Sequence, residues 1–90
     1  MSDAPWRIRV MPTARRQLQR LPERYAAAVV ELLPAIAADP ERLGKPLRFE
    51  LKGRWAARRG PYRVIYALDE KTHTVIVLAV AHRADAYRNR

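Results

Sequence analysis

The 90-residue sequence lacks several residues on which common catalytic and metal sites depend. It has no cysteine, which excludes disulfides and thiolate chemistry. Its single serine, Ser2, stands at the start of the chain, so a serine triad is excluded as well. The two histidines, His73 and His82, have no acidic cluster with them, and we therefore expect neither a metal site nor another cofactor. The three glycines are dispersed, which excludes a glycine-rich phosphate loop.

Long hydrophobic runs are also absent from the sequence. No apolar segment approaches the roughly 20 residues of a membrane span, and residues 1–11 lack the apolar stretch of a signal peptide. We therefore expect a cytoplasmic protein that does not enter a membrane. The length fits one domain, residues 1–90. A domain of this size buries only about 60–65% of its unfolded surface, so a bound partner would add to a thin stability margin.

Positive charge is what the sequence has in excess. Eighteen Lys and Arg residues face nine Asp and Glu residues, which gives a net charge of +9. Residues 1–44 carry seven basic and five acidic residues, a net charge of +2, whereas residues 45–90 carry eleven and four, a net charge of +7. A field of this sign attracts phosphate backbones or an acidic protein. A basic surface that only serves solubility is the alternative interpretation.

The first half of the chain predicts one strand followed by two helices. Residues 6–10 alternate apolar and basic side chains, as in a half-buried strand. Thr13 is the expected N-cap of a short amphipathic helix. A second helix is expected over residues 22–39, where Pro34 should kink it and Pro40 should end it.

The second half predicts three strands and little helix. They are expected over residues 55–59, 62–68 and 74–80, joined by a turn at 60–61 and a loop at 69–73. Residues 45–52 should form an irregular approach to the sheet. The element order therefore predicts a two-layer α+β fold, in which the N-terminal strand and a three-stranded antiparallel meander form a sheet and the helical hairpin covers one face.

Three arginines are candidates for a phosphate site. Strand alternation places Arg63 on the face opposite to Val64 and Tyr66, and a tight turn at residues 60–61 could bring Arg58 onto the face of Arg63. Arg83 follows directly after the last strand. Three guanidinium groups on one face would bind a phosphate without a metal. Scattered solvated charges explain the same spacing equally well.

His82 and Tyr87 in the C-terminal tail could add proton transfer to such a site. Cutting RNA without a metal requires a base for the 2′-hydroxyl proton, cations for the developing negative charge and an acid for the leaving 5′-oxygen. Arginine, histidine and tyrosine can fill these roles between them. A single histidine or tyrosine is nevertheless more often a packing or surface residue.

Several motifs together resemble the family of RelE-type toxins. The matching segments are Pro12-Thr13-Ala14-Arg15-Arg16-Gln17-Leu18, Leu21-Pro22, Gly44-Lys45-Pro46-Leu47, Glu50-Leu51-Lys52-Gly53, Trp55, Arg58-Arg59-Gly60, Tyr62-Arg63-Val64-Ile65-Tyr66 and Ala81-His82-Arg83-Ala84-Asp85-Ala86-Tyr87-Arg88. They cover nearly the whole chain. The ending is similar to the branch of the family that carries a His-Arg-x-Asp-x-Tyr motif.

This resemblance implies the toxin of a type II toxin–antitoxin system, a metal-independent endoribonuclease that enters the ribosomal A site and cleaves the exposed codon of the messenger RNA. Arg63 would bind the reacting phosphate, and Arg83 would stabilise the transition state or act as the acid. Tyr87 would orient the base or assist proton transfer. Of two family lysines on one strand, one is replaced here by Arg58 and the other aligns with Ala56, so that one cation is missing.

The resemblance also implies partners and leaves one catalytic role open. A related group uses a glutamate base near the position of Lys45, so the general base here is either His82 or Tyr87. Further cations are expected to bind RNA, namely Lys45, Lys52, Arg54 and Arg59. A RelB-like antitoxin with an acidic or amphipathic segment would wrap the toxin, and operator DNA would be bound only through that antitoxin.

Two other functions remain as alternatives. A ParE-like branch of the same superfamily shares the fold but inhibits DNA gyrase by binding, and it lacks the catalytic tail. Arg83 with Tyr87 four residues later, and the pair of Arg58 and Arg63, favour the nuclease. A domain that merely binds nucleic acid is the third interpretation, although no helix-turn-helix or aromatic RNA-binding signature supports it. The missing cation also allows an inactive toxin.

Overall fold

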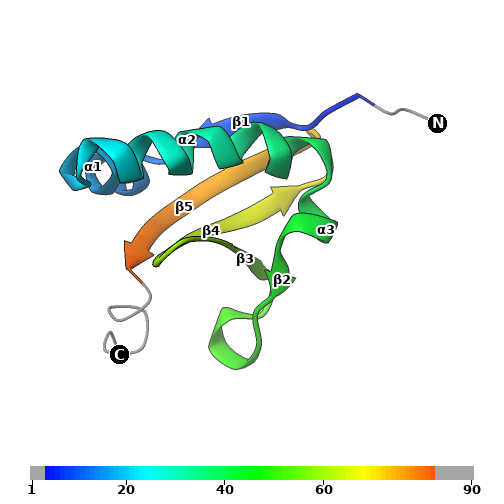
Figure 1. Cartoon of the computed structure of the whole chain (residues 1–90). Helices are drawn as coiled ribbons and strands as arrows, with labels where there is room; N and C mark the ends of the chain where they lie inside the picture. Colours follow the sequence, from blue (N-terminus) through cyan, green and yellow to red (C-terminus); the bar gives the residue numbers. More distant parts are fainter. Residues whose placement is uncertain (1–3, 83–90) are drawn as a thin grey trace.

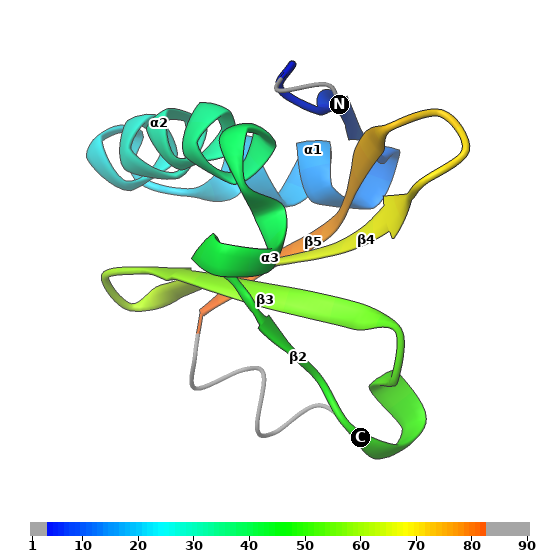
Figure 2. The same ribbon diagram turned by 90° about the vertical axis from the view of Figure 1, so that its right-hand side faces the viewer.

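Two layers make up the fold, a five-stranded sheet and a set of helices on one of its faces (Figures 1 and 2). The computed structural model describes residues 4–82. Its strands are β1 (Arg7–Val10), β2 (Lys45–Pro46), β3 (Arg54–Arg59), β4 (Tyr62–Asp69) and β5 (Thr74–His82). Its helices are α1 (Pro12–Arg20), α2 (Glu23–Ala38) and α3 (Pro40–Leu43), with a 3-10 turn η1 (Phe49–Leu51). This arrangement confirms the predicted α+β class.

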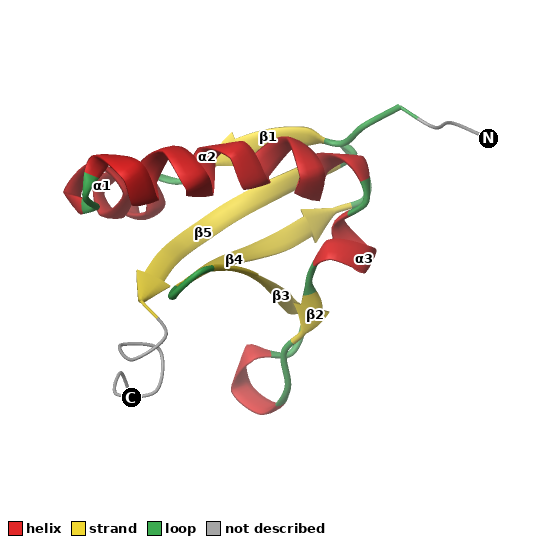
Figure 3. Cartoon of the chain, in the orientation of Figure 1, coloured by secondary structure: helices red, strands yellow, loops and turns green. Residues whose placement is uncertain are grey.

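The sheet has the strand order β1-β5-β4-β3-β2 (Figure 3). β3, β4 and β5 form the predicted antiparallel meander, and β1 lies parallel to β5. The prediction that residues 45–52 are wholly irregular was wrong, because Lys45–Pro46 pairs with β3 as β2. Two residues are too few to show a strand pattern, and this strand forms only because β3 offers a free edge. Among residues 4–82, no helix combines the length and apolar character of a transmembrane span.

The helical hairpin differs from the prediction at its ends. Helix α1 begins at Pro12 with Met11 as its N-cap, so the expectation that Thr13 is the N-cap was wrong. A proline fits the first turn because its fixed φ suits a helix and its missing N–H has no partner there anyway. For the same reason Pro40 can begin α3, two positions after α2 ends at Ala38. Pro34 lies inside α2, on its exposed side, without ending the helix.

The core lies between the helices and one face of the sheet. Its fully enclosed members are Ala14, Val29, Leu32 and Ile36 from the helices, with Ala57, Val64, Tyr66, Val75, Val77 and Val80 from the strands. These strand residues confirm the alternation predicted for β4, where Val64 and Tyr66 face the helices. The side chains at alternate positions form what we call the open face: Arg54, Ala56 and Arg58 of β3, with Arg63, Ile65 and Ala67 of β4.

Tyr66 ties the connection between α3 and β2 to the sheet. Its buried hydroxyl donates a hydrogen bond of 2.5 Å to the backbone oxygen of Pro40 and accepts one from the backbone N–H of Gly44. A Cβ atom at Gly44 would lie 2.1 Å from the Tyr66 hydroxyl oxygen and 3.1 Å from the backbone oxygen of Ala56. Only glycine fits this close approach. The contact fixes the position of Lys45, the next residue, at the edge of the open face.

Candidate functional site

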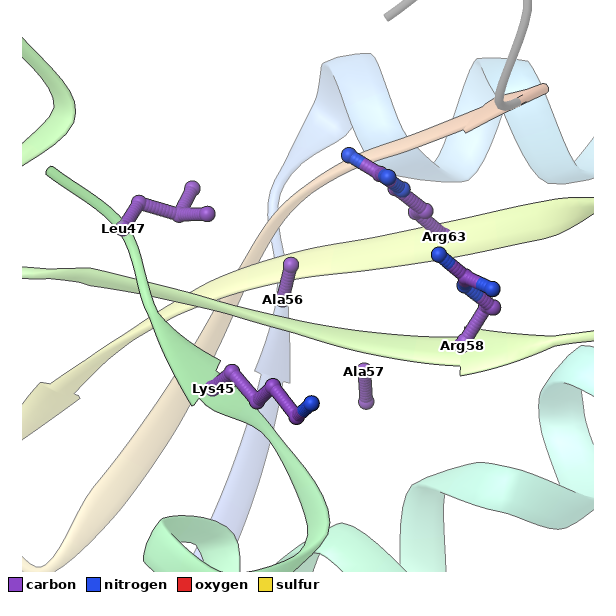
Figure 4. A pocket seen from close by; sticks show the side chains of 6 residues that line it. All are labelled: Lys45, Leu47, Ala56, Ala57, Arg58 and Arg63. Atoms are coloured by element: carbon purple, nitrogen blue, oxygen red, sulfur yellow. The ribbon is translucent and has the colours of Figure 1, made fainter.

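Two arginines lie opposite each other where β3 turns into β4. The strand register pairs Arg58 with Arg63, and Figure 4 shows their side chains side by side. The turn consists of two residues, with Gly60 at a φ of +59°. A glycine at the first central position favours such a tight hairpin. The register thus confirms the expectation that this turn brings Arg58 and Arg63 onto one face.

A cavity of about 450 Å³ lies beside this arginine pair. Its lining residues are Lys45, Leu47, Ala56, Ala57, Arg58 and Arg63. Lys45 comes from β2, where it pairs with Ala56, so three neighbouring strands each contribute one cation. The small side chain of Ala56 leaves space between them. The volume falls in the range of about 300–1,000 Å³ that is typical of small-ligand sites.

The charge of the cavity favours an anion. Like charges at paired positions of neighbouring strands repel each other, so an anion between Arg58 and Arg63 would reduce their repulsion. Lys45 and Arg58 are exposed and Arg63 is half-buried, which leaves the first two accessible to a ligand from solution. Guanidinium forks match the geometry of phosphate oxygens. The cavity can therefore hold a phosphate and stabilise additional negative charge on it.

The other predicted RNA-binding cations are not among the residues that line the cavity. Arg54 is exposed on the open face at the start of β3. Lys52 follows η1 and is exposed. Arg59 is exposed at an alternate position of β3, paired with Tyr62, and so does not share the open face with Arg58.

His82 lies on the other side of the sheet from the arginine pair. Its ring contacts Tyr62 edge-on with the centroids 5.3 Å apart, and Tyr62 packs in turn against Tyr25 of α2. The register pairs His82 with Tyr62 and the preceding Ala81 with Arg63. The structure therefore does not bring His82 to Arg58 and Arg63. The remaining two candidates, Arg83 and Tyr87, lie outside the described residues.

Sequence reasoning missed Leu47 as a lining residue. Its backbone N–H donates a 2.8 Å hydrogen bond to the backbone oxygen of Arg54, which extends the pairing of β2 with β3 by one step. The segment had been predicted as irregular, so no face could be assigned to its side chains. The Gly44-Lys45-Pro46-Leu47 motif was the only available signal.

Comparisons with known proteins give concordant results. The family model described as "ParE toxin of type II toxin-antitoxin system, parDE" matches residues 8–87. Toxin RelG of Mycobacterium tuberculosis is 51% identical over 85 residues, which cover 93% of this chain and 98% of that protein. Toxin RelE of the same organism is 48% identical over 87 residues, which cover 96% of this chain and 90% of that protein.

Solved structures agree with the sequence matches. The toxin–antitoxin complex RelBE2 from M. tuberculosis contains a chain that superposes with a TM-score of 0.86 at 48% identity, covering 93% of this chain and 98% of that one. A chain of the archaeal RelE–RelB complex from Pyrococcus horikoshii OT3 matches with a TM-score of 0.69 at 23% identity, covering 89% and 97%. The second match concerns the fold alone.

Proposed function

We infer that the chain, which belongs to the RelE and ParE family of toxins of type II toxin–antitoxin systems, is an endoribonuclease that cuts messenger RNA in the ribosomal A site. The observation that carries this proposal is the convergence of Lys45, Arg58 and Arg63 on one cavity. Three cations from three strands suit a phosphate that gains negative charge during the reaction.

The proposed reaction is an attack of the 2′-oxygen on the adjacent phosphorus. The 2′-hydroxyl gives its proton to a base while a bond forms between the 2′-oxygen and phosphorus. The bond from phosphorus to the 5′-oxygen breaks, and the 5′-oxygen takes up a proton from an acid. Arg63 and Arg58 stabilise the charge on the phosphate oxygens, so the step needs no metal. Arg83 is proposed as a further cation or as the acid. Since His82 packs on Tyr62 on the far side of the sheet, Tyr87 is the better candidate for assisting proton transfer.

The proposed partner is a RelB-like antitoxin. A relative that is 48% identical to this chain has been solved as a toxin–antitoxin complex, and a net charge of +9 favours an acidic partner. We expect the antitoxin to cover the basic open face and to silence cleavage. Operator DNA would be bound only through the antitoxin. With the ribosome orienting the message, cleavage of free RNA should be poor.

A ParE-like inhibitor of DNA gyrase is the second candidate. It is favoured by the matched family model, which describes the toxin of a parDE system. The cationic cavity argues for the nuclease, because inhibition by binding alone does not require cations arranged around a phosphate-sized space.

The test is primer-extension mapping of a message translated in vitro, with and without ribosomes. Wild-type protein should cut only with ribosomes, and Arg63→Ala should lose at least tenfold in rate, equivalent to about 1.4 kcal/mol in the barrier. Arg20→Ala, a change of an exposed arginine at the end of α1, serves as the control and should cut normally. If wild-type protein cuts under neither condition, the nuclease proposal fails and a gyrase supercoiling assay decides the second candidate.

A further inference from the structure

Phe49, the only phenylalanine in the sequence, is exposed at the tip of the connection between β2 and β3. Its relative exposure is 86%, compared with 36–51% for the other exposed large hydrophobic residues described. It is not among the side chains that pack against the core. Figures 1 and 2 place this connection at the end of the molecule away from α1 and α2. The fold therefore gains no burial from this ring.

The backbone at Phe49 is held in an unusual conformation. Its φ is +60°, in the left-handed region that bulky residues rarely adopt. Backbone hydrogen bonds close the turn, from the Leu51 N–H to the Arg48 oxygen and from the Lys52 N–H to the Phe49 oxygen. Neither bond uses the phenyl side chain. Exposure and strain together at one aromatic residue indicate a binding role more than a structural one.

The surroundings of Phe49 are basic. Residues 45–54 contain four cations, Lys45, Arg48, Lys52 and Arg54, and a single acid, Glu50. Arg48 and Lys52 flank the ring in sequence, and all four cations are exposed. An aromatic ring between cations is the arrangement by which proteins stack an unpaired base and hold the phosphates on either side of it.

We propose that Phe49 stacks on an unpaired base of the ribosomal RNA, with Arg48 and Lys52 on the flanking phosphates. This inference rests on the proposed function and adds a second point of attachment. Arg54 and Arg58 are four positions apart on β3, about 13 Å at a strand's rise. Phe49 lies in the turn that follows the pairing of Leu47 with Arg54, beyond the Arg54 end of β3. When the scissile phosphate is at the arginine pair, Phe49 therefore contacts RNA next to the reacting codon.

The proposal is tested by two binding measurements and one kinetic measurement for each variant. They are the Kd for ribosomes that carry no message, the Kd for the antitoxin, and kcat and KM for cleavage on programmed ribosomes. Phe49→Ala and Phe49→Leu should each raise Kd and KM at least fivefold while kcat stays within twofold. Phe49→Trp should bind as well as wild-type protein, because indole also stacks. Val30→Ala, at an apolar residue of α2 that is 51% exposed, should change nothing, and melting temperatures verify that every variant is folded.

Several results would overturn this inference. Equal ribosome affinity of Phe49→Ala and wild-type protein would refute it, because the variant has no ring to stack. Wild-type affinity in Phe49→Leu would show that only an apolar group is needed. A loss confined to antitoxin binding would assign the ring to a protein partner, and a loss seen only with programmed ribosomes would assign it to the message. Wild-type protein that does not bind ribosomes at all would instead refute the proposed function.

Discussion

At the scale of single residues, the pairing of Arg58 with Arg63 suits phosphate binding but disfavours the sheet, because the two positive charges repel each other. Like charges directly opposite each other on neighbouring strands are destabilising, whereas a favourable cross-strand pair contributes roughly 0.2–1 kcal/mol. Because Arg58 lines the cavity, Arg58→Gln should reduce cleavage at least tenfold. Because it also removes a like charge opposite Arg63, it should not lower the melting temperature, and at low salt the melting temperature should rise slightly. Thermal unfolding at low and high salt measures this. A clear fall in melting temperature would show that Arg58 holds the sheet together instead.

Tyr66 couples the stability of the fold to alkaline pH. Burial of its hydroxyl, with a smaller contribution from Asp39, raises its pKa from 10.0 to about 12, although the Gly44 N–H opposes the shift. The folded state therefore holds this proton more tightly than the unfolded state does. Its contribution is complete below pH 10 and is lost as the pH rises from about 10 to about 12, at roughly 1.4 kcal/mol per unit.

The prediction is that Tyr66→Phe flattens this part of the stability profile. Urea unfolding between pH 8 and pH 12 should show a steeper fall for wild-type protein than for the variant, whatever their difference at neutral pH. Tyr25→Phe, at a half-buried tyrosine of α2, is the control and should keep the wild-type slope. Parallel curves for wild-type protein and Tyr66→Phe would contradict the assignment.

The sequence predicted the face of Tyr66 but not its partners. Alternation along β4 is enough to place Val64 and Tyr66 together against the helices. The hydrogen bond to Pro40 spans 26 residues, and the space requirement at Gly44 arises only when α3 and β2 meet the sheet. For the same reason the pairing of Arg58 with Arg63 was predictable from a two-residue turn, whereas the approach of Lys45 from a separate strand was not.

At the scale of elements, Gln17 of α1 completes the hydrogen bonding of β5. β1 pairs with β5 only as far as Val77, and the buried Val80 beyond it donates its N–H to the Gln17 side-chain oxygen over 2.7 Å. Gln17→Ala leaves this donor without its acceptor and should cost about 1–3 kcal/mol of unfolding free energy. Faster amide exchange at Val80 would accompany the loss. Gln19→Ala, on the exposed side of the same helix, should be neutral in both measurements.

Helix and strand positions followed from local pattern, whereas helix ends depended on proline geometry. A helix was predicted through Pro34, and α2 does continue through it. Pro34 has no N–H to donate to the backbone oxygen of Val30, four residues earlier. Because Val30 is exposed, that oxygen can accept a hydrogen bond from water instead. Pro40 was interpreted as the end of a helix although it also begins α3, and α1 begins at Pro12, before the predicted N-cap Thr13. The two-residue strand β2 had no pattern of its own to detect, because its existence depends on the edge of β3.

At the scale of the whole molecule, the net charge of +9 is concentrated in the half of the chain that supplies β2 to β5. This charge attracts any polyanion, and it also supplies the particular cations of the cavity. The two contributions differ in their dependence on salt. A diffuse field weakens as a whole when ions screen it, whereas each cation bound to a phosphate releases a counterion and adds its own increment to the salt slope.

Lys45 separates these two contributions. Lys45→Gln should reduce the slope of log K for ribosome binding against log[salt] by about one, as expected for one lost phosphate contact. Lys71→Gln removes the same charge from the exposed turn between β4 and β5, which does not line the cavity, and should leave the slope unchanged. Affinity measured across a salt series gives both slopes. An equal reduction in both variants would mean that the positive charge acts as a general field and that Lys45 has no phosphate of its own.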